Sequence, residues 1–326
     1  MTIRKYLLSK KLNLILWHNI KFINRLFCQM FDLSKEKETL YIIGNGFDLH
    51  HEIESRYSDF QRYLYNNGKS FLANNIEMFY PNVIGKGNHC KWGDLEMALG
   101  EVDVKTTYNE CNEDIEKDDE HIERTFAIWE EKPQLILERL LSELQKYFEL
   151  WVNDIDIRNI KPDNSIYQFS TLGKFLSFNY TETLETVYGV PREAITYIHG
   201  RRRCRDNLIL GHNTKIDYHK YLTESEELFY KENAYKGIVQ IANTKRKNVK
   251  DIIASKREFW NSIKAIKKIV TYGHSFSEVD IPYFEQIRKS VSSKTEWYLG
   301  YYSAEDEKRA KELVKNWGID STLFHF

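Results

Sequence analysis

The sequence predicts an α/β protein in which a parallel sheet is flanked by helices and interrupted by a helical insertion. Short apolar runs alternate with helix-patterned segments at both ends of the chain. Four of these runs stop at a polar or glycine-rich break: Leu40–Asp48, Phe175–Tyr180, Tyr197–Gly200 and Ile269–Ser275. Because the carboxyl ends of parallel strands meet at one crevice in a Rossmann-like sheet, we expect the four breaks to form a single site.

The composition is that of a globular protein. The chain has 326 residues, a hydrophobic fraction of 42% and a formal net charge of −1, so no overall field attracts nucleic acid, and we expect no specific nucleic-acid partner. The four cysteines lie far apart and form no Cys-x-x-Cys pair. We therefore expect reduced thiols, a cytoplasmic location and no metal site.

Residues 1–38 are predicted to form a basic, amphipathic N-terminal arm, and residues 39–326 the α/β domain. The apolar run at 12–17 is too short for a secretory signal or a bilayer span, because His18 and Lys21 interrupt it. Self-association through the arm, giving a homo-oligomer, and an extension of little consequence are the favoured alternatives. Association of residues 1–31 with a membrane surface is a further, less favoured one.

The first expected strand ends at a glycine turn. Gly44 and Gly46 allow the backbone to approach a ligand closely, and free N–H groups at the start of the next helix favour an anion or a polar ligand edge. The simpler alternative is a tight strand-to-helix connection. Residues 50–67 are expected to form a helix over the site, with Tyr57 and Phe60 in the core. The cluster Trp92–Glu96 opens another helix, with Asp94 as a plausible cap.

An acidic insertion is expected near residues 101–124. Its eight carboxylates between Glu110 and Glu123 favour a solvated, mobile segment over a packed element. A divalent-cation site is the alternative, although no glycine organises the carboxylates as a calcium loop requires. Leucine and aromatic residues then repeat at the helical interval, so residues 134–152 are predicted to form a long helix packed on the sheet.

The second half continues the α/β alternation. Residues 172–178 and 196–198 are expected strands, and residues 215–265 read as helices. The segments 268–272, 279–291, 296–302 and 304–317 are then expected as strand, helix, strand and helix. A basic cluster of Arg201, Arg202, Arg203 and Arg205 follows the break at Gly200. It is either a solvated face or, at the rim of the crevice, a phosphate-binding group.

Several short sequence motifs resemble those of the AbiH family of bacterial abortive-infection proteins, which act in phage defence. The resemblance covers about residues 39–302 and leaves out the arm and the acidic insertion. Its blocks are Ile43–Leu49, Tyr57–Phe60, Trp92–Glu96, Phe178–Glu185, Ile198–Gly200 and Gly273–Asp280.

More distantly, the order of the strand-end motifs is similar to that of sirtuin-like domains that bind or hydrolyse NAD. This resemblance implies Asn179 and His199 as catalytic residues. The expected ligand-binding residues are Gly44, Asn45, Gly46, Phe47, Asp48, Gly273, His274, Ser275, Asp280 and Arg201. The bulky Phe47 and the acidic Asp48 depart from the small residues of sirtuins, and a carboxylate there suits a ribose hydroxyl better than a phosphate. The zinc cysteines of sirtuin deacetylases are missing from the sequence, which argues against deacylation.

The expected activity is hydrolysis of the nicotinamide–ribose bond of NAD or a related nucleotide. A His199 with an ordinary pKa near 6.5 could serve as general base, and Asn179 could hold the water or a ribose hydroxyl. A structural strand-end role for His199 and a helix N-cap role for Asn179 are the alternatives. Ser275 lacks the Gly-x-Ser-x-Gly pattern of a nucleophilic serine. The non-enzymatic alternative is a nucleotide-binding sensor or toxin-like interaction module, triggered by a partner or a phage protein.

Overall fold

The computed structural model describes residues 37–85, 91–116, 118, 120–163, 173–222 and 228–325. Apart from residues 37 and 38, the predicted N-terminal arm lies outside the described residues, and with it the expectations of self-association and membrane contact. Of the four cysteines, Cys111 is buried and Cys204 is exposed, and both are free thiols.

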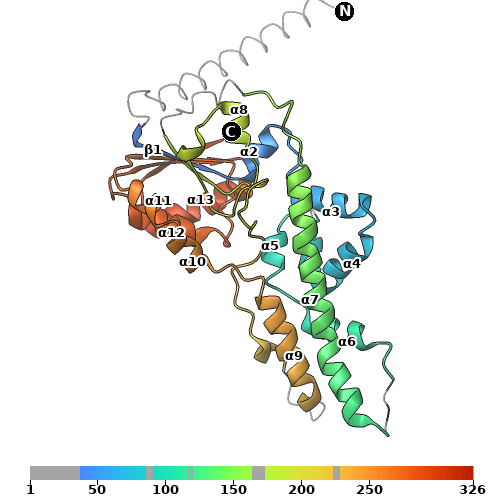
Figure 1. Ribbon diagram of the computed structural model, residues 1–326. Coiled ribbons are helices and arrows are strands. Elements are labelled where there is room, and N and C mark those ends of the chain that lie inside the picture. The colour runs from blue at the N-terminus through green and yellow to red at the C-terminus, as the bar shows by residue number, and fades with distance from the viewer. Residues whose placement is uncertain are drawn as a thin grey trace, which may run out of the picture.

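The sheet has six strands, all parallel, in the spatial order β3-β2-β1-β4-β5-β6. Figure 1 shows this sheet edge-on. The strands are β1 (Thr39–Ile43), β2 (Lys174–Ser177), β3 (Ile195–Tyr197), β4 (Lys268–Tyr272), β5 (Glu296–Tyr301) and β6 (Ser321–His325). This is the strand order of a Rossmann-like sheet, and the α/β prediction is confirmed. The order reverses between β1 and β4, so the ligand crevice of such a fold lies beyond the carboxyl ends of these two strands. The sequence analysis missed β6.

Both faces of the sheet are buried, which explains why β1 is a continuous apolar run. Leu40 and Ile42 pack into one core, and Tyr41 and Ile43 into the other. The first face is covered by α10 (Val249–Ser255), α11 (Arg257–Ser262), α12 (Ile281–Ser290) and α13 (Ala304–Trp317). The second is contacted by α2 (Asn45–His50), α8 (Thr183–Tyr188) and the short helix η3 (Arg192–Ala194).

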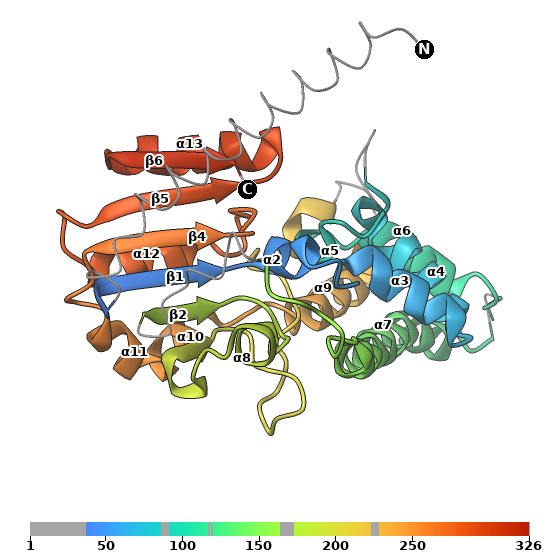
Figure 2. The ribbon, with the colours of Figure 1, turned by 90° about the horizontal axis from the view of Figure 1, so that it is seen from above.

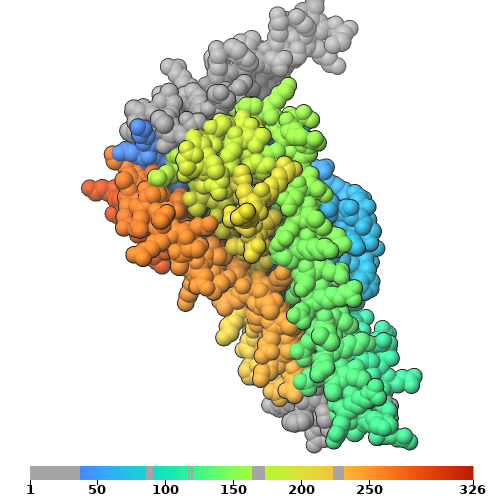
Figure 3. Space-filling model, viewed as in Figure 1, coloured from blue at the N-terminus to red at the C-terminus, as the bar shows by residue number. Residues whose placement is uncertain are grey.

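A helical cap lies beyond the carboxyl ends of the strands (Figure 2). It consists of α3 (Tyr57–Asn66), α4 (Ser70–Phe79), η2 (Pro81–Ile84), α5 (Leu95–Ala98), α6 (Val104–Asn112), α7 (Ile122–Asp154), η4 (Tyr218–Tyr221) and α9 (Leu228–Asn243). The connection from β1 to β2 supplies α3–α7, and the connection from β3 to β4 supplies η4 and α9. The helices α7 and α9 pack along each other and extend away from the sheet (Figure 3). The cap has its own hydrophobic core.

The structure differs from the prediction in the acidic segment and in the long helix. Residues 104–112 form α6, whose Val104, Tyr108 and Cys111 recur at helical spacing and are buried in the cap, while Glu110 faces solvent. Asp103 caps this helix by accepting a hydrogen bond from the Thr106 amide (3.0 Å). The long helix α7 begins at Ile122 rather than at residue 134, and it packs in the cap against α6 and α9 rather than on the sheet. The dense charge between Glu110 and Glu123 hid the end of α6 and the start of α7.

The turns after β1 and β4 are in direct backbone contact. Gly44 N donates to Tyr272 O (2.9 Å), and Gly46 N donates to Gly273 O (2.7 Å). A Cβ atom on Gly44 would lie 2.6 Å from Gly273 O, and one on Gly273 would lie 2.1 Å from Phe47 N. The glycines are therefore required by the packing of one turn on the other. Two of the N–H groups that were predicted to be free to bind an anion, those of Gly44 and Gly46, are therefore already hydrogen-bonded.

We expect Gly273→Ala to lower the free energy of unfolding by more than about 2 kcal/mol, because the positive φ of 66° costs a side chain about 1 kcal/mol and the clash with backbone atoms adds to that cost. Gly68→Ala is the matched control. Gly68 has a φ of 68°, and a Cβ atom added to it would meet nothing within 4 Å, so this variant should lose only the strain of about 1 kcal/mol. Urea unfolding measures both values, and equal losses would contradict the packing argument.

Candidate functional site

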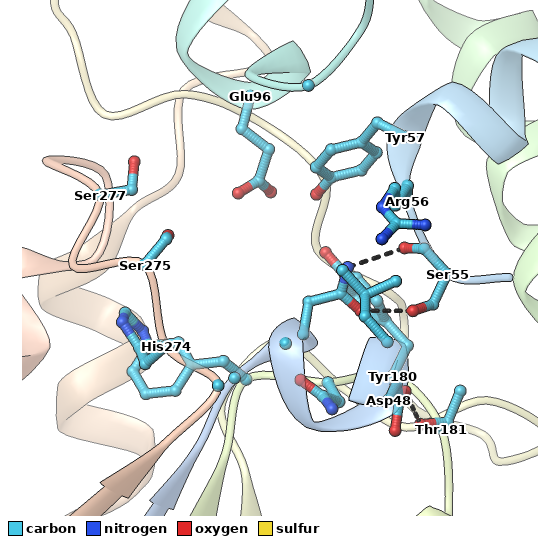
Figure 4. Close-up of a pocket in the computed structure, with 18 of the residues that line it drawn as sticks. Asp48, Ser55, Arg56, Tyr57, Glu96, Tyr180, Thr181, His274, Ser275 and Ser277 are labelled. Carbon is cyan, nitrogen blue, oxygen red and sulfur yellow. Dashed lines mark hydrogen bonds between the residues drawn. The ribbon is translucent and has the colours of Figure 1, made fainter. Parts of the chain in front are cut away.

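A cavity of about 840 Å³ lies between the carboxyl ends of the strands and the helical cap. Its volume falls within the range of roughly 300–1,000 Å³ that is typical of small-molecule sites. In Figure 4 the strands approach the cavity from one side, and Glu96 and Tyr57 reach into it from the opposite side. The cavity is thus built by both parts of the fold.

The structure brings together most of the residues that the sequence analysis selected. The predicted residues that line the cavity are Gly44, Asn45, Gly46, Asp48, Asn179, His199, Gly273, His274, Ser275 and Asp280. The four strand-end breaks therefore converge on one cavity. Phe47 and Arg201 are not among its lining residues.

Phe47 and Arg201 have other surroundings. The Phe47 ring is fully buried and contacts the rings of His51 and Tyr272, at centroid distances of 4.8 and 5.7 Å. It fills the core beneath the turn. Arg201 Nε donates to Glu185 Oε1 (3.2 Å), which turns this guanidinium toward α8.

Asn45 and His274 are held by local hydrogen bonds. Asn45 donates to Ser55 O (2.9 Å) and accepts from Ser55 Oγ (2.7 Å), as the dashed lines in Figure 4 show. Phe276 N donates to His274 Nδ1 (2.9 Å), so the neutral His274 ring carries its proton on Nε2, which lies 3.4 Å from Asp280 Oδ2. His274 therefore orients Asp280.

Arg202 of the basic cluster belongs to no solvated face, because it is only 1% exposed. Its Nε and Nη2 donate to Glu182 at 2.6 and 2.9 Å. Its Nη1 donates to the carbonyls of Val152 and Ile155 at the end of α7. Arg202 thus satisfies carbonyls that the helix end leaves unpaired and fastens the cap to the loop after β3.

A chain of buried charged groups crosses the cavity wall. Lys247 Nζ lies 2.8 Å from Glu96 Oε1 and 3.3 Å from His199 Nε2. His199 Nε2 is also 3.6 Å from Asp280 Oδ1. Glu96 comes from the cap, Asp280 follows β4, and Lys247 lies in the connection between α9 and α10. With His199, which follows β3, four distant parts of the chain share one electrostatic network.

His199 does not have the near-neutral pKa that was expected. Burial, reinforced by the nearby Lys247 ammonium, lowers the pKa of His199 to about 3, so the ring is neutral at pH 7. An ammonium group can only donate, so His199 Nε2 must be the acceptor and Nδ1 must carry the proton. In this arrangement the lone pair of His199 is directed at Lys247.

The two carboxylates of the network have pKa values displaced in opposite directions. Burial raises the pKa of Glu96, and Lys247 only partly opposes this effect. Burial would also raise the pKa of Asp280, but the hydrogen bond from His274 and the charge of Lys247 outweigh it and lower that pKa to about 2. Titratable neighbours whose pKa values diverge in this way are typical of acid–base sites.

The wall next to the glycine turn carries unsatisfied acceptors. Thr181 Oγ1 donates to Asp48 Oδ2 (2.5 Å), whereas Asp48 Oδ1 and Asn179 Oδ1 have no hydrogen-bond partner among the described residues. Both side chains are buried and line the cavity. Buried acceptors need donors, so this wall suits a ligand that presents hydroxyl groups.

Sequence reasoning missed several residues of the site. Glu96 and Tyr57 stood in recognised blocks, but neither had been assigned chemistry, and Tyr57 had been expected in the core. Arg56 is the one lysine or arginine among the described residues that line the cavity. No feature of the sequence marked Lys247 as a site residue, because it follows Lys245 and Arg246 in a basic run that is typical of a solvated surface.

Within the described parts of the chain, no three His, Cys, Asp or Glu side chains gather as a metal site would require. Among those same residues, no helix combines the length and apolarity needed to cross a bilayer.

We expect Arg202→Ala to destabilise the fold by about 3–5 kcal/mol, because it leaves Glu182 and two helix carbonyls without their partner. Arg203→Ala is the control, since its side chain is 57% exposed, and it should change stability by no more than about 0.5 kcal/mol. Chemical denaturation of both variants tests this. A loss for Arg202→Ala as small as that for Arg203→Ala would contradict the anchoring role.

The buried His199 should make stability fall in acid. Its pKa is near 6.5 in the unfolded chain and about 3 in the fold, so the unfolded state binds more protons between these values. The unfolding free energy should decrease as pH falls below 6.5, with His199 contributing up to about 1.4 kcal/mol per pH unit. Relative to wild type, His199→Gln should flatten this dependence, measured by urea unfolding between pH 7.5 and 5. The exposed His219→Gln should leave the dependence unchanged.

Comparison with known proteins agrees with the motifs gathered at this cavity. A family model described as bacteriophage abortive infection AbiH matches residues 40–301, a stretch that runs from the second residue of β1 to the end of β5 and includes the helical cap. No curated protein and no solved structure matches the chain. The chain belongs to the AbiH family, and this membership implies a role in phage abortive infection.

Proposed function

We propose that this AbiH protein binds NAD or a related nucleotide in the cavity and hydrolyses its N-glycosidic bond during abortive infection. The observation that carries the proposal is the juxtaposition of unsatisfied acceptors at Asp48 and Asn179 with the buried network of Glu96, His199 and Asp280. The similarity of the strand-end motifs to sirtuin-like domains supports NAD as the ligand.

The carboxylates suit cleavage of a nicotinamide–ribose bond. The pyridinium leaves as a neutral base, so no general acid is needed, and positive charge develops on the ribose. An ionised Asp280 in a buried setting stabilises such charge, as preorganised electrostatic groups do in other enzymes. His199 next to Asp280 is neutral, so it does not repel the positive charge that develops on the ribose.

The ligand would be oriented by its hydroxyl groups. Asp48 Oδ1 and Asn179 Oδ1 would accept hydrogen bonds from the ribose diol, which supplies two donors on adjacent carbons. Phosphates would lie at the Arg56 side of the cavity rather than on the glycine turn, whose N–H groups at Gly44 and Gly46 are already bonded. Asn179 and His199 would thus position ribose and water.

We expect the full-length protein, incubated with NAD, to release nicotinamide, measured by chromatography with and without an extract of phage-infected cells. His199→Ala should lower kcat at least tenfold, because it removes a group that orders the reacting centre. His219→Ala is the matched control and should keep the wild-type rate, since His219 is exposed and belongs to η4.

Two outcomes count against parts of the proposal. If the wild-type protein releases no nicotinamide under either condition, it is not an NAD glycohydrolase, and binding of NAD in calorimetry would then favour the sensor alternative. If His199→Ala is as fast as the wild type, hydrolysis stands and only the role of His199 is wrong.

A further inference from the structure

We propose that Glu96, which belongs to the helical cap, is the general base that activates water for the hydrolysis. This inference rests on the proposed function and adds a catalytic residue to it.

Glu96 has the position that the role requires. It stands in the first turn of α5, lines the cavity and reaches into it from the side opposite the strands (Figure 4). The Asp48 and Asn179 acceptors belong to the strand side. A ribose held there would present the face of its C1′ atom to the cap, where a water could lie between the sugar and Glu96.

The other two candidates for the base are less suitable. The Nε2 lone pair of His199 faces Lys247, and its Nδ1 carries a proton, so neither nitrogen is free to accept one. Asp280 is held ionised with a pKa of about 2, which makes it a weak base. Burial instead raises the pKa of Glu96 toward the working pH, where a general base is most effective.

The reaction step balances without a further reactant. The water oxygen forms a bond to C1′, and the C1′–N bond breaks, with its electron pair leaving on the neutral nicotinamide. One water proton passes to the Glu96 carboxylate, and the other remains in the new hydroxyl group of the ribose. Glu96 then returns its proton to solvent.

Lys247 acts as a positioning residue in this scheme. Its side chain is fully buried, and its ammonium holds the Glu96 carboxylate at 2.8 Å and His199 Nε2 at 3.3 Å. Its charge opposes the effect of burial on the Glu96 pKa and so favours the ionised form that a base requires. Lys247 also links the β1–β2 connection, which contains α5, to the β3–β4 connection, which contains α9.

The test compares Glu96→Gln with Glu101→Gln in the full-length protein, using NAD and measuring nicotinamide. Glu96→Gln should lower kcat by about 10²–10⁴ with little change in KM, because a base acts in the transition state. In the wild type, kcat/KM should fall at low pH because Glu96 becomes protonated, and this acidic limb of the pH profile should be absent from Glu96→Gln. Added formate should restore part of the rate of Glu96→Ala. Glu101→Gln should behave as wild type, since Glu101 is exposed and lies outside the cavity lining.

The outcomes separate the two proposals. A wild-type protein without activity overturns the hydrolase itself, and with it the base. An active wild type with an equally active Glu96→Gln, or one that keeps the acidic limb, overturns only the assignment of Glu96. If Glu96→Gln unfolds because Lys247 is left unpaired, the double variant Glu96→Gln/Lys247→Met replaces it. Full activity of that folded variant would likewise overturn the assignment.

Discussion

The backbone contact between the turns after β1 and β4 is the constraint on which the rest of the site depends. Gly44, Gly46 and Gly273 lack side chains because each turn occupies the space where the other's Cβ atoms would lie. The contact sits at the reversal of strand order, where a parallel sheet opens a crevice. It fixes the floor on which Asp48, Asn179 and His274 converge.

The cap completes the cavity through buried polar contacts as well as through hydrophobic packing. Arg202 fastens the end of α7 to the loop after β3, and Lys247 pairs with Glu96 across the cavity wall. Breaking such a buried pair on one side is costly because the remaining charge stays buried. The position of the cap is thus specified by groups that also set the pKa values of the site.

The sequence was sufficient to predict the sheet and much of the strand side of the cavity, because glycine and polar residues after apolar runs mark strand ends. Asn179, His199 and Gly273 were found in this way. The sequence was insufficient where a run of acidic residues concealed helices that pack in the cap, as at the end of α6 and the start of α7. It was also insufficient where the role of a side chain depends on its burial in the fold. Nothing in a run of lysine and arginine distinguishes the buried Lys247 from the half-buried Lys245 and the exposed Arg246. The pKa of His199 depends on that hidden partner, so it could not be predicted either.

The two connections that build the cap have a consequence for the order in which the protein matures on the ribosome. The helix α7 is translated before β2, whereas its packing partner α9 comes after β3, and Lys247 follows α9. A nascent chain that ends before α9 therefore has Glu96 without its counterion and a cap core without its last helix. Non-local contacts of this kind form late. The cavity is in this way kept from assembling until most of the chain has been synthesised.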